Sequence, residues 1–291
     1  MKKNTYIIGG ISLTVLALLL LCLNCNRLKN TIPTNSTSNV DTNNETQQKP
    51  NSQKEQSTMK QDNHSSTAQS NNDFLLDSYS RMEAHSKIDV TSFSKKERKS
   101  LFTSSEIDEA TFSRMQGKSY KDNCTVPREE LRYLRLLHKD LDGNTRIGEL
   151  VVNKSIAGKV KKLFFELYEK DYPIEKMVLI DEYDADDNKS MSDNNTSSFN
   201  FRVIEGTKKL SKHSLGLAID INPRYNPYIH TLNGKVVCSP KNGEDYVDRS
   251  KDFPYKIDTN DLAYQLFTEA GFEWGGAWNS SKDYQHFQID N

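Results

Sequence analysis

The chain has 291 residues, enough for one large domain or two small ones with appended segments. Its 39 lysines and arginines almost balance its 40 aspartates and glutamates, so the composition gives no reason to expect a nucleic-acid partner. The sequence also contains no P-loop and no dinucleotide-binding fingerprint, which argues against nucleotide chemistry.

The N-terminus has the pattern of an export signal or a membrane anchor. Two lysines precede a mainly apolar stretch over residues 6–23, which approaches the length of a membrane span. Positive charge ahead of such a stretch keeps the N-terminus inside and sends the rest of the chain across the membrane. Residues 1–25 are therefore predicted to be a cleaved signal, a retained anchor, or a lipoprotein signal ending at Cys22 or Cys25. The protein is expected in the cell envelope, outside the cytoplasm.

A polar tract follows from residue 26 to residue 73. It is dominated by Asn, Ser, Thr, Gln and Lys, and such a composition cannot bury enough apolar surface to offset the entropy of ordering the chain. We predict a disordered tether there. Residues 74–126 are predicted to be an N-terminal helical extension, and residues 127–291 the main domain. Whether Cys124 and Cys238, one in each of these parts, form a disulfide is left open by the sequence.

Apolar spacing predicts the elements of the main domain. A helix is expected over 153–170, where apolar residues recur at helical spacing, and a second helix over 260–270, with a glycine after it. A short apolar run at 177–180 and an alternating segment at 199–204 are expected to be strands. Because strands and helices do not alternate regularly, the pattern favours an α+β fold with a small antiparallel sheet flanked by helices.

The segment 211–222 carries the first candidate site residues. From residue 217 it alternates, so that three apolar side chains lie on one face and Asp220 on the other. A carboxylate in the middle of an apolar strand needs a compensating charge, and a bound cation is one such compensation. Gly216 permits a bend that would bring His213 toward the face that bears Asp220.

The C-terminus repeats this pattern. His286, Gln288 and Asp290 share one face of a predicted strand, and Asp283 lies three residues before its start. Two imidazoles and one carboxylate form a three-ligand zinc site with a fourth position open for water, which is the catalytic rather than the structural arrangement. Asp283 is the candidate base for that water.

Several separate motifs resemble the zinc peptidoglycan peptidases, a family that includes D-alanyl-D-alanine carboxypeptidases and L-alanyl-D-glutamate endopeptidases. The resemblance extends from about Asp142 to the C-terminus. The motifs that carry it follow in this order: Asp184–Asp187, Asn194–Arg202, Gly206–Thr207, Ser211–Pro223, Asn226–Tyr228, Trp274–Trp278 and Asp283–Gln288.

This resemblance implies one catalytic Zn2+ held by His213, Asp220 and His286, with Asp283 as the catalytic base. It also implies a peptidoglycan stem peptide as the substrate. The membrane, through the N-terminal segment, is the other expected partner, and a monomer is expected.

Further roles follow from the same resemblance. Arg202 would bind the substrate and stabilise the charge that develops in the transition state. Ser211 would either bind the substrate or cap a turn, and Trp278 would either line the cleft or pack against the domain. His138 and His230 match no motif, so we interpret both as structural.

Three functions stay open at this point. The first is a carboxypeptidase that removes the terminal D-Ala of a stem peptide, and the second is an endopeptidase that cuts between L-Ala and D-Glu. The third, from a different class, is an inactive metal-stabilised module that binds the cell wall. A carboxypeptidase needs a cation for the terminal carboxylate, whereas an endopeptidase needs a cleft that is open at both ends.

Overall fold

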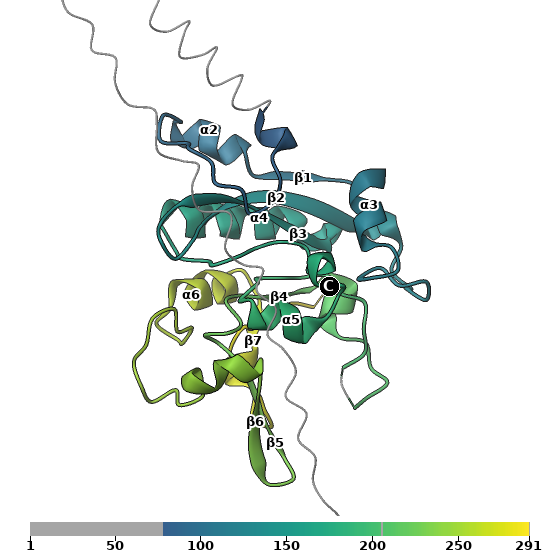
Figure 1. Cartoon of the computed structure of the whole chain (residues 1–291), viewed down its shortest axis with the longest axis vertical. Coiled ribbons are helices and arrows are strands. Elements are labelled where there is room, and N and C mark those ends of the chain that lie inside the picture. Colours follow the sequence, from purple (N-terminus) through teal and green to yellow (C-terminus); the bar gives the residue numbers. More distant parts are fainter. Residues whose placement is uncertain (1–77, 205, 291) are drawn as a thin grey trace, which may run out of the picture. The chain divides into compact units, whose positions relative to one another are not determined.

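A long antiparallel hairpin forms the centre of the first sheet. In the computed structural model, which describes residues 78–204 and 206–290, β2 (Leu131–Lys139) pairs with β3 (Thr145–Asn153) along its full length (Figure 1). The short strand β1 (Thr103–Ser105) adds to the other edge of β2, which gives the order β1-β2-β3. Gly143 lies in the hairpin turn with a φ of 80°, a conformation that glycine adopts without strain. We did not predict this hairpin from the sequence.

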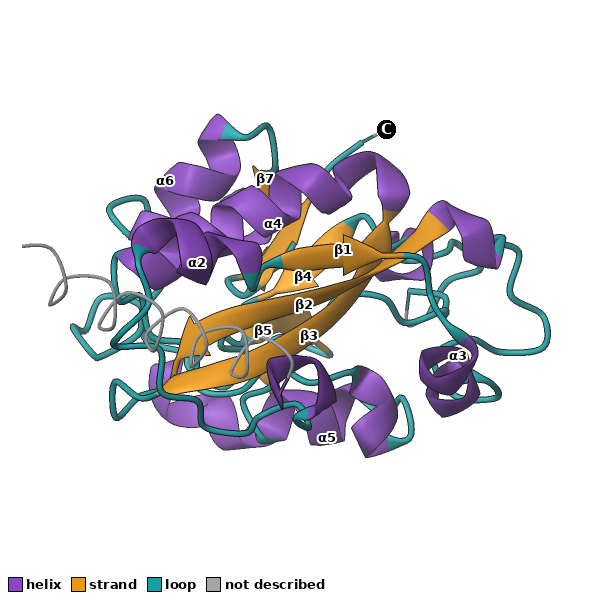
Figure 2. Cartoon of the chain, turned by 90° about the horizontal axis from the view of Figure 1, so that it is seen from above, coloured by secondary structure: helices purple, strands orange, loops and turns teal. Residues whose placement is uncertain are grey.

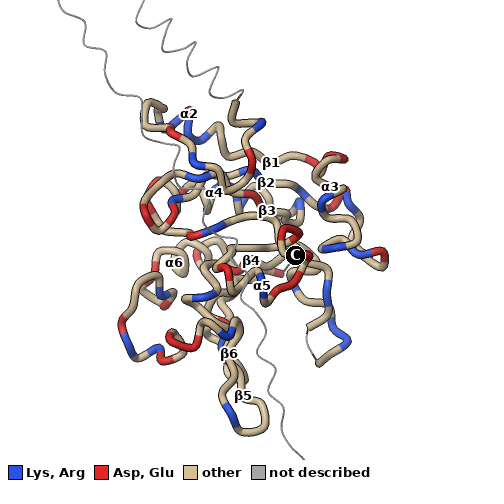
Figure 3. Tube along the Cα trace, viewed as in Figure 1, with Lys and Arg blue, Asp and Glu red and all other residues tan. Residues whose placement is uncertain are grey.

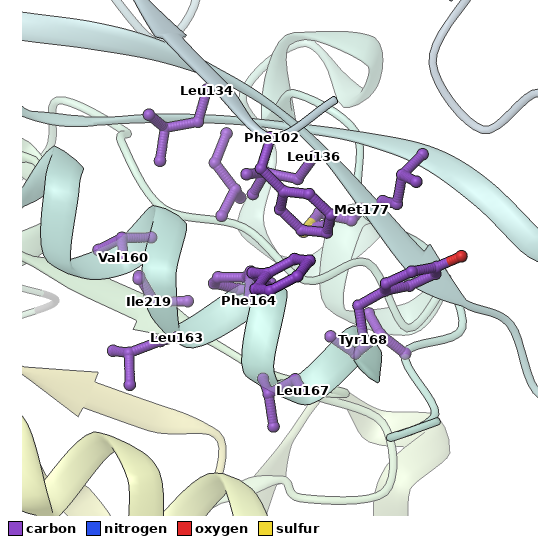
Figure 4. Packing of buried hydrophobic residues seen from close by; sticks show 14 of the residues in the cluster. Phe102, Leu134, Leu136, Val160, Leu163, Phe164, Leu167, Tyr168, Met177 and Ile219 are labelled. Atoms are coloured by element: carbon purple, nitrogen blue, oxygen red, sulfur yellow. The ribbon is translucent and has the colours of Figure 1, made fainter. Parts of the chain in front are cut away.

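Helix α4 (Lys154–Glu169) directly follows β3 and packs on β2. The Asn153 side chain begins the helix by accepting a hydrogen bond from the Ser155 amide, as an N-cap residue does. The predicted helix over 153–170 is therefore confirmed. Its apolar face joins the main core, in which aromatic and aliphatic side chains from β2, α4 and the later strands interlock (Figure 4). The labelled members are Phe102, Leu134, Leu136, Val160, Leu163, Phe164, Leu167, Tyr168, Met177 and Ile219.

Two further antiparallel sheets contain the remaining strands, which are shorter. One has the order β4-β9-β7 and the other the order β6-β5-β8, so the mixed α+β class with small antiparallel sheets is confirmed. Helix α6 (Leu262–Glu269), capped by Asp261, confirms the helix predicted over 260–270. The bounds of these strands are β4 Ala218–Asp220, β5 Tyr228–Leu232, β6 Lys235–Ser239, β7 Glu273–Trp274, β8 Lys282–Asp283 and β9 His286–Gln288.

The segment 74–126, predicted as a helical extension, supplies the helices α2 (Lys95–Ser100) and α3 (Glu109–Met115) together with strand β1. Phe102 and the buried side chains before it belong to the same core as α4, whereas Ile107, Met115 and Val126 belong to a second core with Phe199 and Phe201. In the view of Figure 2, helix α5 (Asp187–Ser192) lies beyond β3, and the strands of the sheet separate it from α4. Short 3-10 helices connect the elements at Arg128–Glu130, Ile180–Tyr183, Lys212–Leu215, Lys241–Tyr246 and Gly275–Ala277.

Two predicted strands are wrong. Residues 177–179 are extended but form no strand, because the Asn195 side chain makes the hydrogen bonds to the Val178 backbone that a neighbouring strand would make. Residues 199–204 are also not a strand, although Phe199 and Phe201 do point into a core. The alternation in that segment is real, but its backbone amides bond to scattered partners rather than to one strand. The amides of Phe199, Asn200 and Phe201 donate to Val151 of β3, to His213 and to Ser119.

Acidic and basic residues are interspersed along the described chain (Figure 3). Cys124 and Cys238 are both free, so no disulfide joins them. Within residues 78–204 and 206–290, no helix has the length and apolar character needed to cross a membrane. The predicted leader and tether lie outside the described residues.

Candidate metal centre

Three buried side chains from separate parts of the chain meet at one point. His213 Nε2 lies 3.1 Å from His286 Nδ1 and 3.3 Å from an oxygen of Asp220. His286 Nδ1 lies 2.9 Å from the other oxygen of Asp220. The structure thus brings together three groups that each offer one ligand atom, all within 4.8 Å of one another.

The β4–β9 ladder sets two of these positions. Asp220 and His286 are direct partners across the two antiparallel strands, so their side chains project from the same face. Their neighbours Ile219 and Phe287 are also partners, and both are fully buried in the main core. The predicted alternation in both segments is confirmed by this arrangement.

A glycine bend sets the third position. His213 lies in the 3-10 helix Lys212–Leu215, which ends at Gly216 in the left-handed conformation, with a φ of 66°. A Cβ atom on Gly216 would lie 2.5 Å from the backbone nitrogen of Asn153 at the start of α4. Only glycine fits this close approach without displacing the backbone, so the bend that returns His213 to Asp220 depends on it.

Backbone and side-chain acceptors fix the tautomers of the two histidines. His213 Nδ1 lies 2.6 Å from the Ser198 carbonyl, and His286 Nε2 lies 3.1 Å from Oε1 of Gln288. Because a carbonyl oxygen can only accept, each of these ring nitrogens carries the proton of the neutral imidazole. The other nitrogen of each ring then presents a lone pair toward Asp220. Bonds of this kind orient metal-ligating histidines in proteins.

The donor set fits a zinc ion. Two imidazole lone pairs and a carboxylate converge in a buried position, which is unfavourable unless a cation lies between them. Zinc–nitrogen bonds of about 2.0–2.1 Å in a tetrahedron place neighbouring ligand atoms about 3.3 Å apart. The separation between His213 Nε2 and His286 Nδ1, 3.1 Å, is close to that value. Each imidazole lies against a different oxygen of Asp220, and one ligand atom from each residue lies within 4.8 Å of the other two.

The pKa values show how strongly this group attracts positive charge. Burial alone would raise the pKa of Asp220, but the neighbouring His213 and His286 outweigh burial and hold it well below its usual range. Burial alone would lower the pKa of His286, but Asp220 outweighs burial and raises it to about 9. Without a metal, the site therefore favours a proton in the position that a cation would take.

Asp283 lies beside this group, in β8. Its carboxyl oxygen Oδ1 is buried and has no hydrogen-bond partner in the described structure. Burial raises the pKa of Asp283 to about 6, and the charges of His286 and Asp220 act on it in opposite directions. Gly275 packs closely against both Asp283 and His286. A Cβ atom added to this glycine would lie 2.8 Å from the Asp283 Cβ and 3.3 Å from the His286 Cβ.

An outer set of contacts, missed in the sequence, supports His286. Gln288 accepts from His286 and donates to Glu273, over 3.1 Å in each case. The second oxygen of Glu273 accepts from Trp278 Nε1 at 2.6 Å. The Trp278 ring centroid lies 5.3 Å from that of His286. The same-face spacing of Gln288 and His286 was a usable signal for this contact, whereas nothing local pointed to Glu273.

The remaining predicted residues lie farther out. Arg202 forms an ion pair with Asp187 of α5, and among the described residues its guanidinium forms no ion pair with the three ligand groups. The same Asp187 also accepts from Asn200. Ser211 is the N-cap of the 3-10 helix that carries His213, because its hydroxyl accepts from the His213 amide at 3.3 Å. A contact of Arg202 or Ser211 with substrate stays a prediction.

Residues 205–289 match the model of a family described as D-alanyl-D-alanine carboxypeptidase. The chain therefore carries a domain of this family, and the family is zinc-dependent. His213, Asp220, Asp283 and His286 all fall within the matched segment, whereas Arg202 lies just before it. Searches of curated proteins and of solved structures gave no match to the chain.

Proposed function

We propose that this chain is a zinc peptidase that hydrolyses peptidoglycan stem peptides, with His213, Asp220 and His286 as the metal ligands. The observation that carries the proposal is the converging donor set, in which each histidine uses its second ring nitrogen to bond a fixed acceptor. Zinc in a three-ligand site supplies Lewis-acid activation of water and of a carbonyl oxygen. The family domain at 205–289 supports a peptide as the substrate.

Asp283 is the proposed general base. Its unpartnered Oδ1 would accept a proton from the attacking water and then deliver that proton to the nitrogen of the leaving group. Trp278, held by Glu273 against His286, would line the site. Arg202 would stabilise developing negative charge on the substrate after leaving its pair with Asp187.

Within this function, removal of a terminal D-Ala is the first assignment, supported by the family description. Cleavage between L-Ala and D-Glu is the alternative. The two activities differ in their need for a cation that receives a terminal carboxylate. Arg202 is the proposed cation, and it would serve a carboxypeptidase only after leaving its pair with Asp187.

We also propose that the domain acts outside the cytoplasm, where its substrate lies. The apolar stretch after two lysines supports export, and a retained stretch would hold the domain at the membrane.

Mass spectrometry of muropeptides digested by the purified, zinc-loaded protein tests these assignments. Loss of one alanine supports the carboxypeptidase, and release of a stem peptide cut after L-Ala supports the endopeptidase. A parallel digest with a chelator is the control. Unchanged muropeptides together with stoichiometric bound zinc would favour the inactive binding module instead.

A further inference from the structure

The hairpin of β5 and β6 is joined to the candidate site through strand β8. Tyr228 of β5 is the direct antiparallel partner of Asp283 in β8. Direct partners in an antiparallel pair project their side chains from the same face of the sheet. The face of the hairpin that carries Tyr228 is therefore continuous with the carboxyl group of the proposed base.

Alternation along the strands extends this face outward. His230 and Leu232 follow Tyr228 at period two, and Val237 and Lys235 are their partners on β6. We call these five residues the hairpin strip. From Tyr228 to Leu232 the strip spans about 13 Å, at about 3.3 Å per residue. Figure 1 shows the hairpin extending away from β4 and β7, so the strip leads outward from the site.

The strip carries groups whose bonding capacity is unused. The rings of Tyr228 and His230 stack, with centroids 5.0 Å apart and planes inclined by 22°. His230 Nδ1 is buried and has no hydrogen-bond partner, and the Tyr228 hydroxyl makes none of the hydrogen bonds found in the described structure. Leu232 is 55% exposed. A stacked, half-buried aromatic pair beside an exposed leucine suits an extended peptide, whose small apolar side chains can pack on it.

We propose that the hairpin strip binds the stem peptide beyond the scissile bond, and so makes the enzyme prefer long substrates to short ones. This inference rests on the proposed function and extends it. A chain of three to four residues would cover the strip from Asp283 outward, at about 3.3 Å per residue. His230, interpreted as structural from the sequence, becomes a residue that determines specificity.

The test compares the full stem peptide with the shortest fragment of it that the wild-type protein hydrolyses. The variant is the full chain with His230→Ala and Leu232→Ala. The matched control is Thr231→Ala with Val236→Ala, a pair of partners on the opposite face of the same hairpin. We expect kcat/KM for the full peptide, relative to the fragment, to fall at least tenfold in the strip variant, mainly through KM. An unchanged ratio, or an equal fall in the control, would overturn the proposal.

A failure of the proposed function has a different signature. If the wild-type protein hydrolyses no stem peptide at all, the peptidase assignment fails, and the strip is then tested by calorimetric titration with the intact stem peptide. Weaker binding in the strip variant than in the wild type and the control would support the strip. Equal affinity in all three proteins, or no binding by the wild type, would refute it.

Discussion

Asp220 and His286 face each other across β4 and β9, and His286 Nδ1 lies 2.9 Å from the Asp220 carboxylate. The backbone ladder itself therefore sets the distance between two of the three candidate ligands. On the opposite face, Ile219 and Phe287 anchor the same pair of strands in the core. The stability of the core and the geometry of the site are thus coupled through one strand register, since a shift of either strand by one residue would move its ligand into the core.

The bond from His286 to Gln288 leads to a prediction about metal affinity. Replacing Gln288 with alanine removes the acceptor that orients the His286 ring, and loss of such a partner weakens metal binding by about 10- to 100-fold. Competition with a chromophoric chelator measures this change. The control is Asp290→Asn, the next same-face position, whose carboxylate instead pairs with Lys212. An unchanged affinity in Gln288→Ala would contradict the role of this contact.

Asp283 leads to a prediction about hydrolysis. Replacing it with asparagine removes the proposed base, so we expect kcat to fall by about 10²- to 10⁴-fold while bound zinc is retained. Asp283→Glu keeps a carboxylate and should retain more activity than Asp283→Asn. Steady-state rates together with metal analysis separate these effects, and full activity in the asparagine variant would refute the mechanism.

The pH profile follows from the same residue. The base must be ionised, and burial raises the pKa of the Asp283 carboxyl to about 6. The rate should therefore rise with pH below about 6 and level off above it. A bound dication would lower this pKa, so the midpoint of the acid limb should lie at or below about 6. A midpoint well above 7 in a plot of kcat/KM against pH would contradict this assignment.

The sequence predicted those parts of the site that a single local pattern determines. Leu217, Ile219 and Ile221 alternate because one face of the segment lies in the core. The same alternation identified Asp220 as an unusual charged residue within an apolar strand. Gly216 was predictable as a bend for the same local reason. The distances between the ligands were not predictable, because they depend on the pairing of strands that are 66 residues apart.

The errors had equally specific causes. The apolar run at 177–180 resembled a buried strand, but its backbone groups bond to the side chain of Asn195, and no periodicity in the sequence reports such a bond. The contact between Glu273 and Gln288 joins residues 15 positions apart, and no spacing or alternation in the sequence pairs them. The β2–β3 hairpin, in contrast, carries an Asp-Gly turn between two apolar segments and was open to prediction.

Gly216 leads to a prediction about stability. An alanine there must adopt a left-handed conformation and also displace the Asn153 backbone, 2.5 Å from its Cβ. We expect the free energy of unfolding to fall by about 3 kcal/mol or more, with weaker zinc binding because His213 moves. Gly143→Ala is the control, since its φ of 80° is similar but no atom lies within 4 Å of an added Cβ. That variant should lose about 1 kcal/mol, and equal losses would show that the close approach is unimportant.

Asp140 leads to a prediction about acid stability. Burial alone would raise the pKa of this carboxyl in the β2–β3 turn, but hydrogen bonds from Arg146 and Asn144 outweigh burial and lower it to about 2. The unfolded value is about 3.9, so the folded protein binds fewer protons between these two pH values. The carboxylate therefore contributes about 2 kcal/mol that is fully present above pH 4 and is lost as the pH falls toward 2.

Urea unfolding at several pH values measures this contribution. Asp140→Asn should be less stable than the wild type at pH 7, by about 2 kcal/mol, and most of the difference should be lost by pH 2, with the rest disappearing below it. Glu166→Gln is the control, because Glu166 forms an exposed pair with Lys162 at 3.8 Å, and such pairs contribute less than about 1 kcal/mol. A difference for Asp140→Asn that persists unchanged at pH 2 would show that its side chain stabilises the turn through its shape rather than through its charge.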